Sequence, residues 1–270
     1  MAIRPWLMCC NKEGTMAQKK VNAVIHSQEK LAEGIYSMWL DAPEMAEAAV
    51  PGQFIAVYTN DPSKLLPRPI SICEADKENG RLRIVYRIAG AGTKEFSECK
   101  AGDTLDIMGP LGNGFPLKKK KAFLIGGGIG IPPMLELAKN LDCEKTAVIG
   151  YRDQETFLAD ELRKYADVVI ATEDGSVGTK GNVMDAIREQ SLDADIIFAC
   201  GPTPMLRAIK AYAEEKKIEC YISLEERMAC GIGACLACVC KTKEKDAHSH
   251  VNNTRICKDG PVFDAQTVEI

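Results

Sequence analysis

Residues 122–135, "AFLIGGGIGIPPML", decide the fold class because they join a buried strand to a helix through a glycine-rich turn. The apolar run ends in glycines, and two prolines open a segment with helical spacing. A turn of this kind leaves backbone N–H groups free to bind a pyrophosphate. Gly128, Gly130 and Pro133 match the pattern G-x-G-x-x-P, which on its own is also typical of a turn that serves only packing.

Downstream of this turn, strand-like apolar runs alternate with helical segments. This alternation predicts a doubly wound parallel α/β sheet with helices on both faces, which we assign to a domain at residues 118–224. A nucleotide is expected where such strands end. The runs lie at residues 122–127, 146–151, 167–172 and 195–201, and the helical segments at 132–141, 157–166, 182–190 and 203–217.

Upstream of the turn, short alternating strands replace the helical spacing. In "RLRIVYRIAG" (residues 81–90), Leu82, Ile84 and Tyr86 fall on one face, and turn signals separate this strand from its neighbours. The pattern predicts a closed or nearly closed antiparallel barrel over residues 17–117. Residues 1–16 carry no secretory pattern, and we expect a disordered extension in which Met16 is a candidate start.

A second decisive stretch, "MACGIGACLACVC" (residues 228–240), concentrates cysteines in a glycine-rich loop. Cys230, Cys235 and Cys238 form C-x4-C-x2-C, and Cys257 follows downstream. This spacing is typical of a plant-type [2Fe-2S] cluster, which takes three ligands from one loop and a fourth from a distant segment. We therefore expect residues 225–270 to form a small cluster domain. Its few apolar residues require a bound centre or a neighbouring surface.

Two alternatives remain for these cysteines. A zinc site can use Cys235, Cys238, His248 and His250, although H-x-H is shorter than the usual histidine spacing and leaves two cysteines unexplained. The thiols can also be inert and buried. The twelve cysteines of the chain are clustered here or scattered among apolar residues, which favours a reducing compartment, and hence the cytoplasm, over a disulfide framework.

Two further stretches point to phosphate-bearing ligands. Arg68 in "LPRPISI" (residues 66–72) can pair with a phosphate, and Ser71 can hydrogen-bond a flavin or its phosphate. In "GAGT" (residues 90–93), Gly92 and Thr93 open a helix-like segment and thus a second anion-binding N-terminus. Each stretch taken alone is also compatible with an ordinary surface turn.

The ends of two predicted strands supply the remaining candidates. Cys200 ends a strand and is followed by Gly201 and Pro202, which shape a loop, although a buried cysteine is often only a small apolar residue. After the second strand, Asp153 favours NAD and Arg152 favours a phosphorylated ribose. The choice stays open at this point, with a preference for NAD.

Charge and hydropathy exclude other classes of function. The formal net charge of -4 and the pI near 5.6 argue against a nucleic-acid surface. No apolar stretch approaches the roughly 20 residues needed to cross a bilayer, so we expect a soluble protein that does not bind membranes.

These motifs, in this order, resemble the ferredoxin-NADP reductase-like superfamily, in which R-P-x-S binds FAD and C-G-P-x-x-M faces the nicotinamide. The cysteine block and "CKDGPVF" (residues 257–263) further resemble the electron-transfer subunits of type B, NAD-linked dihydroorotate dehydrogenases. The resemblance implies FAD, one [2Fe-2S] cluster and NAD(H) as exchangeable substrate. By the same resemblance, FAD falls to Arg68, Pro69, Ile70, Ser71, Val85, Tyr86, Arg87, Gly92 and Thr93, and NAD to Gly128, Gly130, Asp153, Cys200, Gly201 and Pro202.

The function implied by the resemblance is an electron relay from the nicotinamide through the flavin to the cluster. Its partner is then an FMN-containing dihydroorotate dehydrogenase catalytic subunit, with two copies of each chain in a heterotetramer. Met228, Ile232 and Leu236 near the cluster are candidate contacts with that partner, and packing inside the cluster domain is the equally weighted alternative. The alternatives are a flavin and iron–sulfur subunit of an NADH-dependent ferredoxin:NADP oxidoreductase or of a sulfhydrogenase, and a zinc-stabilised binding module.

Overall fold

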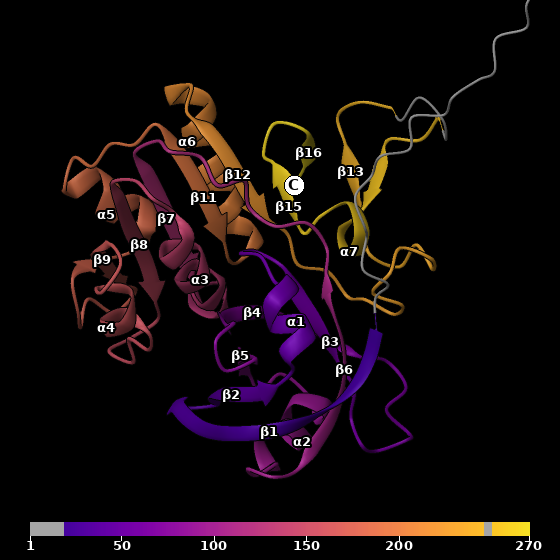
Figure 1. The fold of residues 1–270 in the computed structure, drawn as a ribbon. Coiled ribbons are helices and arrows are strands. Elements are labelled where there is room, and N and C mark those ends of the chain that lie inside the picture. Colours follow the sequence, from indigo (N-terminus) through magenta and orange to yellow (C-terminus); the bar gives the residue numbers. More distant parts are fainter. Residues whose placement is uncertain (1–18, 246–249) are drawn as a thin grey trace, which may run out of the picture.

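The computed structural model describes residues 19–245 and 250–270, and the expected extension at residues 1–16 lies outside them, as does His248. The described residues form a barrel, a larger sheet with helices on both faces, and a small C-terminal sheet (Figure 1). No helix in this part of the chain is long and apolar enough to span a membrane.

The N-terminal strands close an antiparallel barrel, as predicted. The strands are β1 (Lys19–Ala32), β2 (Ile35–Asp41), β3 (Phe54–Val57), β4 (Arg68–Asp76), β5 (Arg81–Arg87) and β6 (Thr104–Leu111), with α1 (Pro43–Ala48) and α2 (Ala91–Glu98) between them. They pair in the order β1-β2-β5-β4-β3-β6. Leu82, Ile84 and Tyr86 point into the barrel core, whereas Val85 on the other face packs against the neighbouring α/β core. The alternation along β5 therefore fixes both of its surfaces.

The larger sheet begins at the glycine-rich turn. Its strands are β7 (Ala122–Gly127), β8 (Lys145–Tyr151), β9 (Asp167–Thr172), β10 (Thr179–Lys180), β11 (Ile196–Cys200), β12 (Glu219–Ser223) and β15 (Val262–Asp264). They pair in the order β10-β9-β8-β7-β11-β12-β15, and all pairs are parallel except β12 with β15. The strand order reverses between β7 and β11, and ligands of doubly wound sheets bind at such a reversal.

Helices cover both faces of this sheet. They are η1 (Gly128–Gly130), α3 (Pro132–Asn140), α4 (Ala159–Leu162), α5 (Val183–Glu189) and α6 (Thr203–Lys216). Phe123 and Ile125 share a core with α5 and α6, whereas Leu124 between them shares a core with α3 and α4. The helix predicted at 157–166 is shorter than expected because Leu158, in the left-handed region at φ 64°, precedes its first turn.

The C-terminal segment packs against both larger units. It contains β13 (Val239–Thr242), β14 (Asn253–Arg255), α7 (Ile256–Asp259) and β16 (Val268–Glu269) in addition to β15. Ile256 and Val268 are buried in a core that also contains Leu111 of the barrel. The segment thus packs on a neighbouring surface, which is one of the two supports expected for it. Sequence reasoning missed β12 and did not foresee that β15 completes the larger sheet.

Charged side chains join the barrel to the α/β sheet. The Arg83 guanidinium is buried, and its Nη2 donates to Glu161 Oε1 of α4 at 3.0 Å. Lys139 Nζ of α3 lies 2.7 Å from Glu74 Oε1 of β4, and the buried Glu136 accepts a hydrogen bond from Ala75 N. These contacts fix the relative orientation of the two units, because breaking one would leave a buried charge without its partner.

Candidate cofactor sites

The predicted flavin motifs meet at one point of the barrel wall. Arg68 opens β4, and its guanidinium donates to Leu66 O. The same guanidinium lies over Gly92 in the first turn of α2, because a Cβ added at Gly92 would lie only 2.1 Å from Arg68 Nε. Only a glycine leaves this space, and the first turn of a helix presents N–H groups without intrahelical partners. An arginine and a helix N-terminus therefore converge, and this arrangement fits the phosphates of FAD.

The side chains of two neighbouring candidates, Thr93 and Tyr86, make hydrogen bonds within the barrel unit. Thr93 Oγ1 accepts hydrogen bonds from Ala89 N at 2.8 Å and Gly90 N at 3.2 Å, so its side chain shapes the start of α2. Tyr86 is buried inside the barrel, where its hydroxyl donates to Gln28 Oε1 at 2.8 Å. Burial raises the pKa of this phenol above its usual value. The Tyr86 ring is therefore committed to the barrel core, whereas Arg87 beside it is exposed.

Two glycine-rich strand ends form the candidate nucleotide crevice. A Cβ at Gly130 would lie 2.2 Å from Cys200 O, and one at Gly201 would lie 2.5 Å from Met205 Cε. Gly128, at φ 53°, has no atom within 4 Å of such a Cβ and faces open space. The predicted glycines thus lie side by side at the strand-order reversal. Met205 was not among the candidate residues, although it is the methionine of the C-G-P-x-x-M pattern that begins at Cys200.

The remaining nucleotide candidates differ in their surroundings. Cys200 is buried at the end of β11 between Gly126 and Ser223, and burial raises the pKa of its thiol. Asp153 Oδ1 accepts a hydrogen bond from Glu155 N at 3.0 Å and so helps to form its own turn, whereas Arg152 is exposed. Neither residue at the end of β8 has a geometry that decides between NAD and NADP.

The four predicted ligand cysteines come together as two pairs. Cys235 N donates to Cys230 Sγ at 3.4 Å, and Cys257 N donates to Cys238 Sγ at 3.4 Å. No three His, Cys, Asp or Glu side chains within residues 19–245 and 250–270 converge as they would around a single ion. A cluster with two irons needs two thiolates at each iron, so paired cysteines fit it better than they fit a zinc ion.

Backbone N–H groups point at these sulfurs. The N–H groups of Ala234 and Cys235 donate to Cys230 Sγ at 3.3 and 3.4 Å, and Gly233 N donates to Cys257 Sγ at 3.0 Å. Gly231 and Gly233 have φ of 71° and 82°, in the left-handed region that favours glycine. Donors aimed at sulfur stabilise thiolates and cluster sulfides alike, so the loop fits an iron–sulfur centre.

The pKa values of the cysteine thiols at this site differ widely. Partial burial disfavours the Cys230 thiolate, but backbone donors, including Ile232 N, lower its pKa to about 6. Burial and the neighbouring Cys238 raise the pKa of Cys257 to about 12. Thiolates this close repel one another, so the thiols lose their protons together only when a metal centre binds. Burial also raises the pKa of Cys240, to about 11, and this thiol makes no pair with the four.

The cysteine loop rests on the flavin barrel. A Cβ at Gly231 would lie 3.3 Å from Leu111 Cδ1 and 3.6 Å from Met108 Cε, both on β6. On the outer side of the loop, Ile232 and Leu236 are 43% and 62% exposed. Met228 is buried at 8% exposure and packs in the shared core, so for this residue the structure supports internal packing rather than partner contact.

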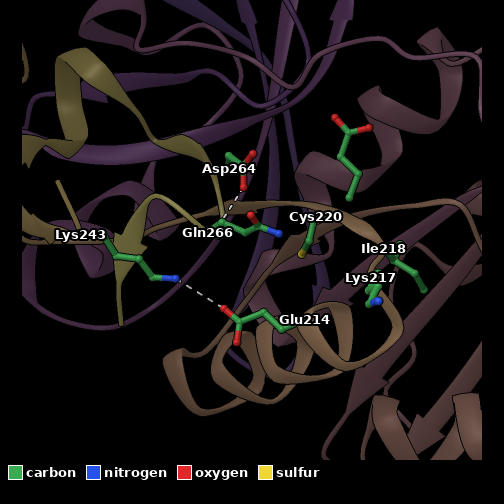
Figure 2. A pocket seen from close by; sticks show the side chains of 8 residues that line it. Glu214, Lys217, Ile218, Cys220, Lys243, Asp264 and Gln266 are labelled. Carbon is green, nitrogen blue, oxygen red and sulfur yellow. Dashed lines mark hydrogen bonds and ion pairs between the residues drawn. The ribbon is translucent and has the colours of Figure 1, made fainter.

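A hollow of about 530 Å³ lies away from these sites, at the amino end of β12 (Figure 2). Lys243 and Glu214 face each other across it at 3.7 Å, and Cys220 lines its floor. Doubly wound sheets bind ligands at the carboxyl ends of their strands, which is the opposite edge. The hollow is therefore a seam between the sheet and the C-terminal segment, and we assign it no cofactor.

Comparison with known proteins agrees with this geometry. Residues 22–115 match the oxidoreductase FAD-binding domain, and residues 225–269 match the iron-sulfur cluster binding domain of dihydroorotate dehydrogenase B. The dihydroorotate dehydrogenase B (NAD(+)) electron transfer subunit of Bacillus velezensis is 42% identical over 261 residues, covering 93% of this chain and all of the relative. This chain belongs to that family. The Fusobacterium nucleatum member is 43% identical over 263 residues, covering 92% and 98%.

Family membership settles several expectations from the sequence. The chain is an oxidoreductase subunit with an FAD-binding barrel and an iron–sulfur domain, and the zinc-stabilised module is set aside. Among solved structures, a chain of the NADH-dependent reduced ferredoxin-NADP oxidoreductase aligns with a TM-score of 0.83 and 30% identity over 95% of this chain and 91% of that one. Phthalate dioxygenase reductase aligns at 0.57 with 19% identity over 93% and 98%, which shows a shared fold.

Proposed function

We propose that this chain relays electrons between NAD(H) and an FMN-containing dihydroorotate dehydrogenase catalytic subunit. The observation that carries the proposal is the paired cysteines on a loop that rests on the flavin barrel. When bound, FAD exchanges a hydride with the nicotinamide and passes single electrons to the cluster. We divide the chain into an FAD domain at 17–117, an NAD domain at 118–224 and a cluster domain at 225–270.

The barrel residues would hold FAD by its phosphates and its ring edge. Arg68 supplies a fixed positive charge, and the start of α2 supplies N–H donors beside Gly92. Because the Tyr86 ring is buried, the stretch around it contributes backbone groups. The residues proposed to bind FAD are Arg68, Pro69, Ile70, Ser71, Val85, Tyr86, Arg87, Gly92 and Thr93.

The crevice between β7 and β11 would hold NAD(H). The glycines let the backbone approach the ligand closely, and the open space at Gly128 leaves room for the pyrophosphate. Cys200 would lie near the nicotinamide as a buried, neutral thiol that excludes water rather than titrates. The residues proposed here are Gly128, Gly130, Asp153, Cys200, Gly201 and Pro202. The relatives are dihydroorotate dehydrogenase B (NAD(+)) electron transfer subunits, which supports NAD over NADP.

The cluster would be a [2Fe-2S] centre ligated by Cys230 and Cys235 at one iron and by Cys238 and Cys257 at the other. The exposed Ile232 and Leu236 lie on the outer side of this loop and support a docking surface for the partner there. We propose a cytoplasmic heterotetramer with two copies of each chain.

Co-expression with the catalytic subunit tests this function. The expected result is a complex that reduces NAD+ with dihydroorotate, and an Ile232→Asp, Leu236→Asp double variant that keeps both cofactors but elutes separately. Val50→Asp is the matched control, because Val50 is 45% exposed and lies on the barrel. The assignment is contradicted if the tagged chain co-purifies with a different redox subunit and with no FMN-containing subunit.

One observation favours a second candidate. The solved chain of the NADH-dependent ferredoxin-NADP oxidoreductase aligns over nearly the whole molecule. In that alternative the same relay serves a ferredoxin-linked partner. The two candidates differ only in the protein that meets the cluster loop, so the identity of the co-purifying subunit separates them.

A further inference from the structure

We infer that Asn113, a surface residue of the flavin barrel, positions the cluster relative to the flavin and so controls electron transfer between them. The inference rests on the proposed relay and adds a residue to it. Asn113 lies just after β6, far along the sequence from the cysteine loop and 144 residues before Cys257.

The Asn113 amide bridges the barrel and the segment that follows Cys257. Its Nδ2 donates to Asp259 O at 2.9 Å and to Lys258 O at 3.2 Å. Its backbone N–H donates to Gly260 O at 2.6 Å, and Asn113 pairs with Pro261 as an isolated bridge. One residue therefore contacts four consecutive residues after the proposed ligand.

The barrel side of this bridge is itself fixed. Gln53 Nε2 donates to Gly112 O at 2.8 Å and ties the loop to the barrel. Gly112 has φ 73°, and a Cβ there would lie 2.5 Å from Pro261 Cδ. The loop and the cluster segment thus touch backbone to backbone, and no side chain fits between them.

Hydrogen bonds also connect Asp259 to the cysteine loop. Arg255 binds Asp259 with two nitrogens, Nε to Oδ2 at 2.9 Å and Nη2 to Oδ1 at 3.1 Å. Arg255 Nη1 also donates to Gly233 O at 3.3 Å. Gly233 N in turn donates to Cys257 Sγ. A movement of Asp259 would therefore move the cysteine loop at Gly233 and the segment that carries Cys257 together.

This arrangement matters for function because electron tunnelling slows exponentially as the separation of donor and acceptor grows. Other anchors of the segment, such as the Leu224 N to Pro261 O bond at 2.9 Å and the pairing of β15 with β12, tie it to the α/β sheet and not to the barrel. Within the described residues, the Asn113 side chain is thus the polar side-chain link from the barrel to the residues after Cys257. It is a positioning residue, and it touches no cofactor in our assignment.

The test measures the flavin-to-cluster step separately from hydride transfer. In the full chain loaded with FAD and cluster, a light flash with a deazaflavin donor reduces the bound flavin, and cluster absorbance follows the electron. Asn113→Ala removes both side-chain donors. Asn113→Asp keeps the size but turns the donor into a carboxylate facing two carbonyl oxygens. Asn79→Ala is the control, because Asn79 Nδ2 donates to Asp76 Oδ2 at 2.8 Å on a barrel turn away from the cluster segment.

We expect cluster reduction to be severalfold slower in both Asn113 variants and unchanged in Asn79→Ala. Flavin content, iron content and flavin reduction by NADH should stay at the level of the unaltered chain. Amide hydrogen exchange at residues 256–261 should become faster in the Asn113 variants only. This second readout holds even if one of the variants loses iron.

Two results overturn the inference, and they differ from failure of the relay. If both Asn113 variants pass the electron as fast as the control, Asn113 has no positioning role. If they also slow flavin reduction by NADH to the same extent, Asn113 acts on the barrel as a whole. If the flash-reduced flavin of the unaltered chain never reduces a cluster, the proposed relay itself is wrong.

Discussion

The nucleotide crevice and the cysteine loop of this molecule are held in place by different forces. The crevice is backbone packed on backbone, with Gly130 against Cys200 O and Gly201 against Met205. The cysteine loop is held by N–H donors to sulfur, and the segment around Cys257 is held by Asn113 and by buried residues such as Ile256. The crevice is therefore complete without its ligand, whereas the loop gathers thiols whose proximity a metal centre must stabilise.

The largest effect is expected when one of the proposed cluster ligands in the cysteine loop is replaced. Cys235 is exposed, so Cys235→Ser costs little packing and tests ligation alone. We expect loss of the cluster, measured as iron content and as the EPR signal of the reduced protein, with FAD retained. Cys240→Ser is the matched control, because that half-buried thiol lies outside the two pairs. Equal iron in both variants would show that the ligand set is wrong.

The next largest effect is expected from a substitution that disrupts packing in the nucleotide crevice and does not touch the cysteine loop. Gly130→Ala places a methyl group 2.2 Å from Cys200 O and should lower the free energy of unfolding by about 3 kcal/mol. Gly128→Ala meets no atom and carries only the cost of a left-handed backbone, about 1 kcal/mol. Chemical denaturation of the two variants measures the difference. Similar losses in both would mean that close packing does not build this crevice.

A smaller effect concerns the proposed flavin site on the barrel, at Arg68. Arg68→Ala removes a charged donor from the proposed phosphates and should weaken FAD binding about tenfold. Flavin retained after dialysis measures the loss. Arg81→Ala is the control, because Arg81 pairs with Asp41 elsewhere on the barrel. Unchanged flavin in Arg68→Ala would remove that residue from the site.

The smallest effect tests the amino end of β12, the strand on which β15 of the cluster segment pairs. Lys118 and Lys120 lower the pKa of Glu219 to about 2. A lowered folded-state pKa stabilises the protein above the unfolded value near 4.5, and this stabilisation is lost as the pH falls towards 2. Glu219→Gln should therefore lower the melting temperature at pH 7 by an amount that shrinks below pH 4.5. A difference independent of pH would exclude an ionic cause.

Much of the fold could be predicted because its signals are local. The glycine turn after residues 122–127 and the alternation at 81–90 each depend on neighbours a few residues apart, and both are confirmed. The pairing of β15 with β12 depends on residues about 40 positions apart, and its three residues carry no strand period of their own. The extent of α4 depends on the backbone of Leu158, which residue type does not reveal.

The site divides in the same way. The spacing of Cys230, Cys235 and Cys238 suffices to predict a cluster because the ligands share one loop. The position of Met228 could not be predicted in this way. Its apolar side chain suits either an interface or a core, and only the packing of the folded chain shows that it is buried. Asn113 carries no motif at all, since its partners are backbone carbonyls.

An anaerobic titration of the purified chain with NADH, followed by absorbance and EPR, tests the central claim most directly. The account predicts that the flavin absorbance bleaches and that the EPR signal of a reduced [2Fe-2S] cluster then appears. Flavin that bleaches while no cluster signal develops, in a protein with a full complement of iron, would contradict the relay.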